Sequence, residues 1–290
     1  MNRISQAFAE RGKVFAAFIT GGDPDIDTTV RLILALAEAG ADLIEIGIPF
    51  SDPVAEGPVI QRASARALAN GCTIARLFTM VEGLRAQVSL PLVFMTYLNP
   101  ILAYGKESFL ARCAEVGIDG LIIPDLPFEE HCELSELCRS HGVSQISMIA
   151  PTSAARIEAI AAAAEGFLYC VSSLGVTGTR EAITTDVKSM IDQVRAVSPI
   201  PCLIGFGIAT PDQAHHFATL ADGIIIGSAI VQLIETHAQA SPTPVANFAQ
   251  TITQALRTPD PARRRALLAA MARNNQESGM LALTLMPDEE

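Results

Sequence analysis

The sequence predicts an α/β fold in which eight parallel strands and their intervening helices close into one (β/α)8 barrel. Two observations support this fold class. Short apolar runs alternate with segments of helical periodicity along the chain. An acidic residue also stands just before every second run. We therefore expect a barrel domain over residues 1–257, followed by a C-terminal helix and tail over 258–290.

The predicted strands are the eight apolar runs, at residues 14–20, 42–47, 92–96, 120–123, 143–149, 167–171, 202–205 and 223–226. Helical periodicity is clear between several of them, at residues 28–39, 109–116, 129–140 and 154–164. Strands that alternate with helices favour parallel pairing. A doubly wound open sheet is the alternative. That fold prefers a Gly-x-Gly-x-x-Gly turn after the first strand, and here the run ends at Thr20-Gly21-Gly22-Asp23-Pro24.

The recurring acids favour the closed barrel over the open sheet. They are Asp42, Asp119, Glu165 and Asp222, before the second, fourth, sixth and eighth runs. Alternate strands of a closed barrel fill the same interior layers, so they can share such a pattern.

Composition limits the classes of function. The net charge of −11 argues against nucleic acid as a partner. An anionic substrate would need capture by backbone N–H groups or helix ends. The six cysteines include no Cys-x-x-Cys pair, which argues against a zinc site or a disulfide framework. The apolar runs are too short for a signal peptide or a membrane span, so we expect a cytoplasmic protein.

Residues 44–58 carry the strongest candidate for chemistry, because they run from a strand into a loop with a carboxylate on each. Alternation along the strand separates Ile44 and Ile46 from Glu45, which would point into the barrel. A buried charge is costly unless it is paired or its pKa is raised. A carboxyl that exchanges a proton near neutrality suits general acid–base catalysis. A salt-bridged structural glutamate is the other interpretation.

Glycine-rich loops after the sixth, seventh and eighth strands predict a phosphate site. They are residues 172–179, 205–213 and 227–231. Glycine lets backbone N–H groups approach an anion closely. Ser228 stands at the expected start of a short helix, where the helix dipole favours phosphate. Thr210-Pro211-Asp212-Gln213 has the pattern of a capping box and marks another helix start.

The motifs at residues 18–24, 45–58, 175–178, 205–208 and 227–231 together resemble the alpha subunit of tryptophan synthase. The resemblance runs from about residue 15 to 237. It implies an enzyme of tryptophan biosynthesis, a lyase that cleaves indole-3-glycerol phosphate to indole and glyceraldehyde 3-phosphate. It also implies no cofactor in this chain, and a beta subunit that carries pyridoxal phosphate. The expected assembly is an α2β2 heterotetramer in which indole passes to the beta subunit.

The resemblance assigns catalytic roles to both carboxylates. Glu45 matches the acid/base of the second strand. Glu56 matches a second carboxylate that would accept a hydrogen bond from the indole N–H. The usual residue there is aspartate, so the side chain here is one methylene longer. Either the loop is repositioned so that Glu56 reaches the same place, or the subunit is slow or uses another substrate. We expect Glu56→Asp to be tolerated or to improve the rate.

Further residues carry over individually from the resemblance. The aromatic residues that would line the indole pocket are Phe18, Tyr97, Tyr169 and Phe206. The residues that would bind phosphate are Gly178, Gly207, Gly227 and Ser228. The residues that would accompany loop closure are Asp52, Asp125 and Thr177. Phe18 can equally be barrel core, Asp125 can equally cap a helix, and Tyr169 could hydrogen-bond to Glu45. No metal ligands are implied.

Two other functions remain open on the sequence alone. One is a stand-alone lyase that releases indole without a partner. The other is a catalytically weak barrel that binds a phosphate ligand and regulates a beta-type subunit.

Overall fold

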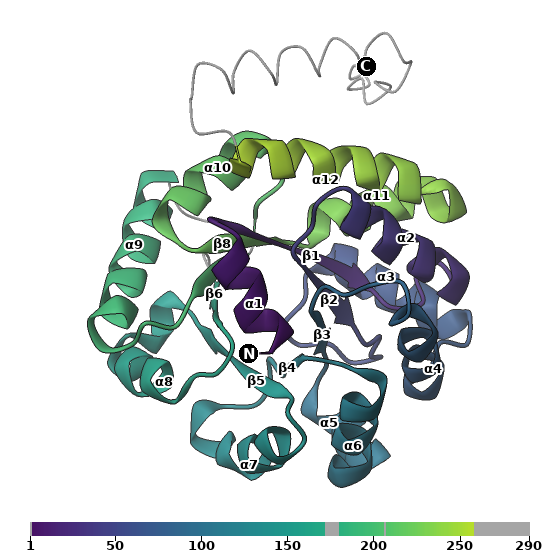
Figure 1. The fold of residues 1–290 in the computed structure, drawn as a ribbon, viewed down its shortest axis with the longest axis horizontal. Coiled ribbons are helices and arrows are strands. Elements are labelled where there is room, and N and C mark those ends of the chain that lie inside the picture. The colour runs from purple at the N-terminus through teal and green to yellow at the C-terminus, as the bar shows by residue number, and fades with distance from the viewer. Residues whose placement is uncertain (1, 172–179, 206, 258–290) are drawn as a thin grey trace, which may run out of the picture.

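The computed structural model describes residues 2–171, 180–205 and 207–257, and its eight strands close into a parallel barrel. The strands follow one another around the barrel in chain order, and β8 pairs with β1 (Figure 1). The predicted closed barrel is confirmed, and the open doubly wound sheet is excluded. The strands are β1 (Val14–Thr20), β2 (Leu43–Gly47), β3 (Leu92–Met95), β4 (Gly120–Ile122), β5 (Ser144–Ile149), β6 (Leu168–Val171), β7 (Cys202–Gly205) and β8 (Gly223–Ile226).

Helices surround the barrel and separate successive strands (Figure 1). The α-helices are α1 (Arg3–Glu10), α2 (Ile26–Glu38), α3 (Pro58–Ala69), α4 (Ile74–Leu84), α5 (Leu98–Tyr104), α6 (Lys106–Val116), α7 (Cys132–Ser140), α8 (Ile157–Ala163), α9 (Arg180–Val197), α10 (Pro211–Leu220), α11 (Ser228–His237) and α12 (Pro242–Arg257). The short 3-10 helices are η1 (Phe128–Glu130), η2 (Pro151–Arg156) and η3 (Ala238–Ala240).

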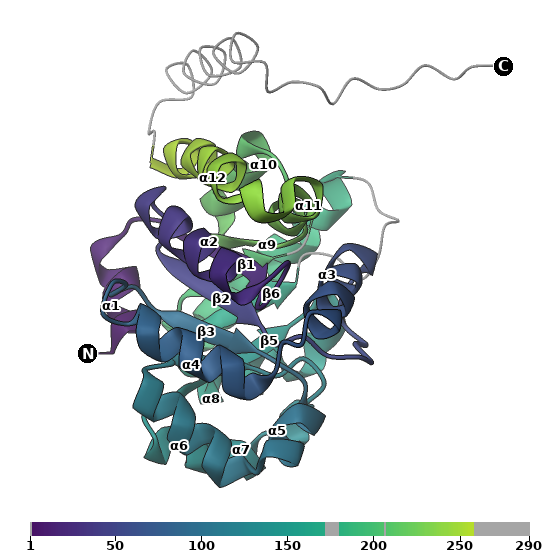
Figure 2. The ribbon, with the colours of Figure 1, turned by 90° about the vertical axis from the view of Figure 1, so that its right-hand side faces the viewer.

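The first helix, α1, closes one end of the barrel, as the side view shows (Figure 2). Ile4 is fully buried, and the Phe8 ring centroid lies 6.0 Å from that of Phe167. The amino end of the barrel is therefore sealed by apolar packing, which leaves the carboxyl ends of the strands for a site.

Two helices differ from the sequence prediction at their amino ends. The expected helix at 129–140 is divided into η1 and α7, and the one at 154–164 is divided into η2 and α8. Tighter 3-10 turns are common at helix N-termini, and both segments begin next to a proline, at Pro127 and Pro151. The predicted C-terminal helix and tail, 258–290, lie outside the described residues.

The strands present one face to the barrel interior and the other to the helices. Val14, Ala16 and Phe18 of β1 belong to an interior apolar cluster, while Phe15 and Ala17 pack in the larger cluster beneath the helices. This alternation follows from the period of two in a strand.

The recurring acids bind the amino ends of the neighbouring strands. In three cases the carboxylate before an even strand accepts a hydrogen bond from a backbone N–H at the amino end of the preceding odd strand. The pairs are Asp42 with Phe15 (3.0 Å), Asp119 with Leu92 (2.9 Å) and Asp222 with Cys202 (2.9 Å). Glu165 differs, because it accepts hydrogen bonds from Arg139 at 2.8 and 3.0 Å. The recurring acidic residues therefore stabilise the end of the barrel that lies away from the site.

Within the described ranges, no helix is long and apolar enough to cross a membrane. The same ranges hold no cluster of three or more His, Cys, Asp or Glu side chains placed to bind a metal ion.

Candidate active site

Glu45 points into the barrel from β2, as its position in the strand predicts. Its neighbours in register are Phe18 on β1 and Val93 on β3. The residue is 1% exposed, and its Oε1 has no hydrogen-bond partner among the described residues. Burial, and then the charge of Glu56, raise the pKa of Glu45 to about 8. Glu45 forms no salt bridge with any described residue, and this carboxyl can exchange a proton near neutral pH.

Glu56 lies in the loop between β2 and α3, and both its backbone and its side chain are held. Its carbonyl accepts a hydrogen bond of 2.8 Å from Nε2 of Gln61, on the first turn of α3. Its carboxylate accepts a hydrogen bond from the hydroxyl of Tyr97. That hydroxyl accepts one of 2.9 Å from the N–H of Ala55. Glu56 is thus fixed from two sides.

The Glu56 carboxyl also has a raised pKa. Partial burial is the largest cause, the Tyr97 hydrogen bond opposes it, and the charge of Asp125 adds to the rise. The charge of Glu56 in turn raises the pKa of Glu45. The two carboxyls therefore lie close enough for the charge of one to affect the proton affinity of the other.

Three of the four predicted aromatic residues lie near the two carboxylates. Phe18, Tyr97 and Tyr169 are all buried. If Gly47 carried a Cβ, that atom would lie 2.7 Å from the tip of the Phe18 ring. A Cβ on Gly205 would lie 2.5 Å from the Tyr169 hydroxyl oxygen. Each ring therefore covers a glycine near the carboxyl end of a strand. Phe206 lies outside the described residues.

Burial, and then the charge of Glu45, raises the pKa of the Tyr169 phenol, so the two side chains lie near each other. The structure shows no hydrogen bond between these two described side chains, and Oε1 of Glu45 has no partner among the described residues. The hydrogen bond considered from the sequence is thus not found among the described residues.

Two of the predicted phosphate residues lie at the start of α11. Gly227 precedes the helix, and Ser228 is its first residue and is exposed. The first N–H groups of a helix have no partner within it, and the dipole there favours an anion. Gly207 has a φ of 74°, and a Cβ built on it would meet no atom within 4 Å. There is thus open space at Gly207. Gly178 lies outside the described residues.

The predicted capping box at the start of α10 is confirmed. The hydroxyl of Thr210 accepts a hydrogen bond from the N–H of Gln213, and the Gln213 side chain accepts one from the N–H of Thr210. This arrangement fixes where the chain turns from the loop after β7 into α10.

The residues predicted to accompany loop closure have different partners. Asp52 is exposed and accepts a hydrogen bond of 2.5 Å from Ser51. Thr177 lies outside the described residues. Asp125 accepts a hydrogen bond of 2.9 Å from the N–H of Leu98, the first residue of α5. Asp125 therefore caps a helix, but the helix begins 27 residues earlier in the chain.

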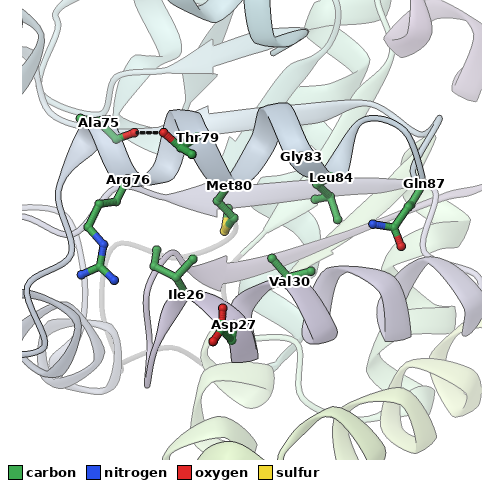
Figure 3. A pocket seen from close by; sticks show the side chains of 10 residues that line it. All are labelled: Ile26, Asp27, Val30, Ala75, Arg76, Thr79, Met80, Gly83, Leu84 and Gln87. Carbon is green, nitrogen blue, oxygen red and sulfur yellow. Dashed lines mark hydrogen bonds between the residues drawn. The ribbon is translucent and has the colours of Figure 1, made fainter.

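A separate groove of about 480 Å³ lies between α2 and α4 (Figure 3). Its lining is mainly apolar, with Ile26 and Val30 from α2 facing Met80 and Leu84 from α4. These two helices belong to the outer layer, so the groove is distinct from the interior site of Glu45.

Sequence reasoning missed an ion-pair group beside the site. The side chain of Asp23 is fully buried and forms two hydrogen bonds of 2.9 Å with Arg66 of α3. Asp23 lies within the motif at residues 18–24, but no local spacing connects it with Arg66. Only the folded arrangement of β1 and α3 reveals the pair.

Comparisons with known proteins identify one family. Residues 4–258 match the family described as tryptophan synthase alpha chain. The chain is 45% identical over 256 residues to the tryptophan synthase alpha chain of Lacticaseibacillus casei, covering 88% of this chain and 96% of that one. It is 50% identical over 230 residues to the one from Lactiplantibacillus plantarum, with coverage of 79% and 87%.

Solved structures give the same result. The crystal structure of tryptophan synthase subunit alpha from Legionella pneumophila matches with a TM-score of 0.81 and 38% identity, covering 88% of this chain and 98% of that one. A tryptophan synthase structure from M. tuberculosis matches with a TM-score of 0.79 and 30% identity, with coverage of 89% and 100%. The chain belongs to the tryptophan synthase alpha chain family, lyases whose alpha reaction cleaves indole-3-glycerol phosphate to indole.

Proposed function

We propose that Glu45 is the proton carrier of the alpha reaction. Cleavage moves one proton from the glycerol hydroxyl next to the breaking bond to C3 of the indole ring. As the C–C bond breaks, the hydroxyl carbon becomes the aldehyde of glyceraldehyde 3-phosphate. A single carboxyl can remove the first proton and deliver one to C3, which requires a pKa near the working pH. The pKa of about 8 and the free Oε1 of Glu45 support this role.

Glu56 accepts the hydrogen bond of the indole N–H in this proposal. Protonation at C3 leaves positive charge on the ring nitrogen, and a fixed carboxylate there stabilises that charge. The hydrogen bonds from Tyr97 and Gln61 hold Glu56 in place before substrate binds. The Glu56 carboxylate thus replaces the aspartate that is usual in the family.

The N-terminus of α11 binds the substrate phosphate in this proposal. Ser228 and the backbone N–H groups of the first turn, which follows Gly227, supply donors, and the open space at Gly207 leaves room for the anion. Gly178 is proposed for the same site. Asp52, Asp125 and Thr177 remain proposed for loop closure, and Phe18, Tyr97, Tyr169 and Phe206 for the indole pocket.

Tryptophan synthase alpha chains function with a beta subunit. For this chain we propose an α2β2 heterotetramer in which indole passes directly to the partner. Pyridoxal phosphate would belong to the beta subunit, and the cleavage here would need only protein side chains. We place the enzyme in the cytoplasm, in keeping with a biosynthetic family.

The test is indole release from indole-3-glycerol phosphate by the purified chain, with and without a beta subunit. We expect turnover that rises strongly when the partner is added. Full activity without the partner would indicate a stand-alone lyase. Activation of the partner by a folded chain that releases no indole would indicate the regulatory barrel and contradict the proposed roles of Glu45 and Glu56.

The phosphate site has its own test. Replacing Gly207 with valine should raise the Michaelis constant for the phosphorylated substrate, because the side chain would occupy open space and strain the positive φ. An unchanged constant in the folded variant would contradict the assignment.

A further inference from the structure

Four charged side chains join three parts of the site that are distant in the sequence. They are Asp23 from the loop after β1, Arg62 and Arg66 from α3, and Glu235 from α11, and we call them the ion-pair clamp. Arg66 is shared. Its Nε and Nη2 bind the two oxygens of Asp23 at 2.9 Å each, and its Nη1 binds Glu235 at 2.8 Å. Arg62 binds both oxygens of Glu235 at 2.8 Å.

The geometry of the clamp restricts how α3 and α11 can move. Paired, parallel hydrogen bonds between a guanidinium and a carboxylate fix orientation as well as distance. Two such pairs occur here, and the helices also contact each other directly. Asn70, beyond the end of α3, adds a hydrogen bond of 2.7 Å to the carbonyl of Pro24. The whole length of α3 is thus tied to its neighbours.

The two carboxylates of the clamp differ in their electrostatics. The hydrogen bond from Arg62 is the main cause that lowers the pKa of Glu235 to about 2. Burial raises the pKa of Asp23 above its ordinary value, and the hydrogen bond and charge of Arg66 oppose that rise. Both oxygens of Asp23 accept hydrogen bonds from Arg66, so Asp23 depends on this one partner for its charge.

Each clamped helix begins at one end of the proposed substrate site. Glu56 stands two residues before the first residue of α3, and Gln61 of α3 holds its carbonyl. Ser228 is the first residue of α11, and Glu235 lies seven residues, or two turns, further along the same face. A rotation of α11 against α3 would therefore move Ser228 relative to Glu56.

We propose that the ion-pair clamp sets the separation between the phosphate end of the site at Ser228 and the indole end at Glu56, with Arg66 as the positioning residue. This inference rests on the proposed phosphate site and on Glu56 as the indole acceptor. A substrate with an indole at one end and a phosphate at the other must bind to both ends of the site at once. A small change in the separation between Ser228 and Glu56 therefore weakens the binding of the whole substrate, while either half alone can still bind.

The experiment compares three probes by calorimetry on the purified chain. They are glycerol 3-phosphate, indole, and an uncleavable analogue in which a saturated chain joins an indole to a phosphate. The variant is Arg66→Lys, which keeps the charge but loses the planar fork that reaches two carboxylates. The matched control is Arg112→Lys, because Arg112 of α6 pairs with Glu82 of α4, away from the clamp.

We expect Arg66→Lys to weaken the joined analogue by about tenfold while each half binds within about twofold of the unaltered chain. Arg112→Lys should change none of the three affinities. The Michaelis constant for indole-3-glycerol phosphate should rise only in Arg66→Lys. A purely structural role would reduce the folded fraction without this selective loss. Unchanged affinity for the joined analogue, or weaker binding of glycerol 3-phosphate alone, would overturn the proposal.

Two further variants keep the result interpretable. Arg62→Gln removes the half-exposed member of the clamp and serves if Arg66→Lys does not fold. It should show the same selective loss to a smaller extent, and no change in it would count against the clamp. Ser228→Asp tests the phosphate site itself. Binding of glycerol 3-phosphate that survives Ser228→Asp would show that the phosphate site is wrong, whatever Arg66→Lys does.

Discussion

The hydroxyl of Tyr97 donates a hydrogen bond to the carboxylate of Glu56, so an aromatic residue between β3 and α5 holds the loop after β2. The Phe50 ring lies 5.3 Å from the Tyr97 ring and supports it from the same loop. The longer glutamate side chain is therefore accommodated by a specific partner, which defines how its carboxylate is presented.

Removing the Tyr97 hydroxyl should weaken catalysis through Glu56. This hydrogen bond lowers the pKa of Glu56 against the effect of burial. In Tyr97→Phe the pKa should rise, so more of the carboxyl is protonated near neutral pH. We expect kcat/KM to fall by about tenfold and its acidic limb to move to higher pH. A pH–rate profile that matches the unaltered enzyme would refute this role.

Shortening Glu56 tests whether the loop depends on its length. We expect Glu56→Asp to keep kcat/KM within about tenfold or to improve it, because the carboxylate is retained at the length usual for the family. Steady-state kinetics with and without the beta subunit give the answer. A larger loss would show that the hydrogen bond with Tyr97 requires the longer side chain. Glu82→Asp on the outer helix α4 is the matched control.

Replacing Glu45 with glutamine should abolish the chemistry without unfolding the barrel. Glutamine has almost the same shape but cannot carry the proton, so we expect kcat to fall by about 10²–10⁴. Circular dichroism should show an intact fold. Retained turnover in the folded variant would remove Glu45 from the mechanism.

The same variant should stabilise the protein in a defined pH range. The folded pKa of Glu45 is about 8, against 4.5 for the ordinary group, so the folded state holds its proton longer than the unfolded state. Stability therefore decreases as pH rises from 4.5 to 8. Glu45→Gln lacks this loss, so its free energy of unfolding should exceed that of the unaltered protein by up to about 5 kcal/mol above pH 8. Urea unfolding at pH 4.5 and 8.5 measures the difference, and an equal difference at both values would contradict the raised pKa.

Asp125 offers a test between a helix cap and loop closure. As a cap of α5, Asp125→Ala should cost about 1 kcal/mol of stability, and Asp125→Asn should cost less because it keeps an acceptor. Thermal unfolding and kinetics on both variants separate the roles. A large fall in kcat/KM with unchanged stability would instead support the proposed part in closure.

The sequence predicted those features that depend on local pattern. Short apolar runs located every strand, and alternation along the second run oriented Glu45 inward. The pattern Thr210-Pro211-Asp212-Gln213 marked the start of α10, because a capping box needs only neighbouring residues. The glycine-rich loop before an expected helix pointed to Ser228, whereas only the resemblance brought Tyr97 into the site.

Long-range pairs could not be predicted in this way. Asp125 binds Leu98, and Asp23 binds Arg66 across 43 residues. Each of these side chains is an ordinary polar residue in its own segment. Their partners are determined by how strands and helices lie beside one another, which one sequence does not reveal.

The carboxylates at the amino ends of the strands also make the barrel's motions observable. Because Asp119 accepts the N–H of Leu92 from β3, that amide proton is shielded only while β3 and β4 stay together. The amides of Phe15 in β1 and Cys202 in β7 likewise donate to a carboxylate that precedes the next strand, β2 or β8. Deuterium uptake at these three amides would therefore show which pair of neighbouring strands separates first when the barrel opens.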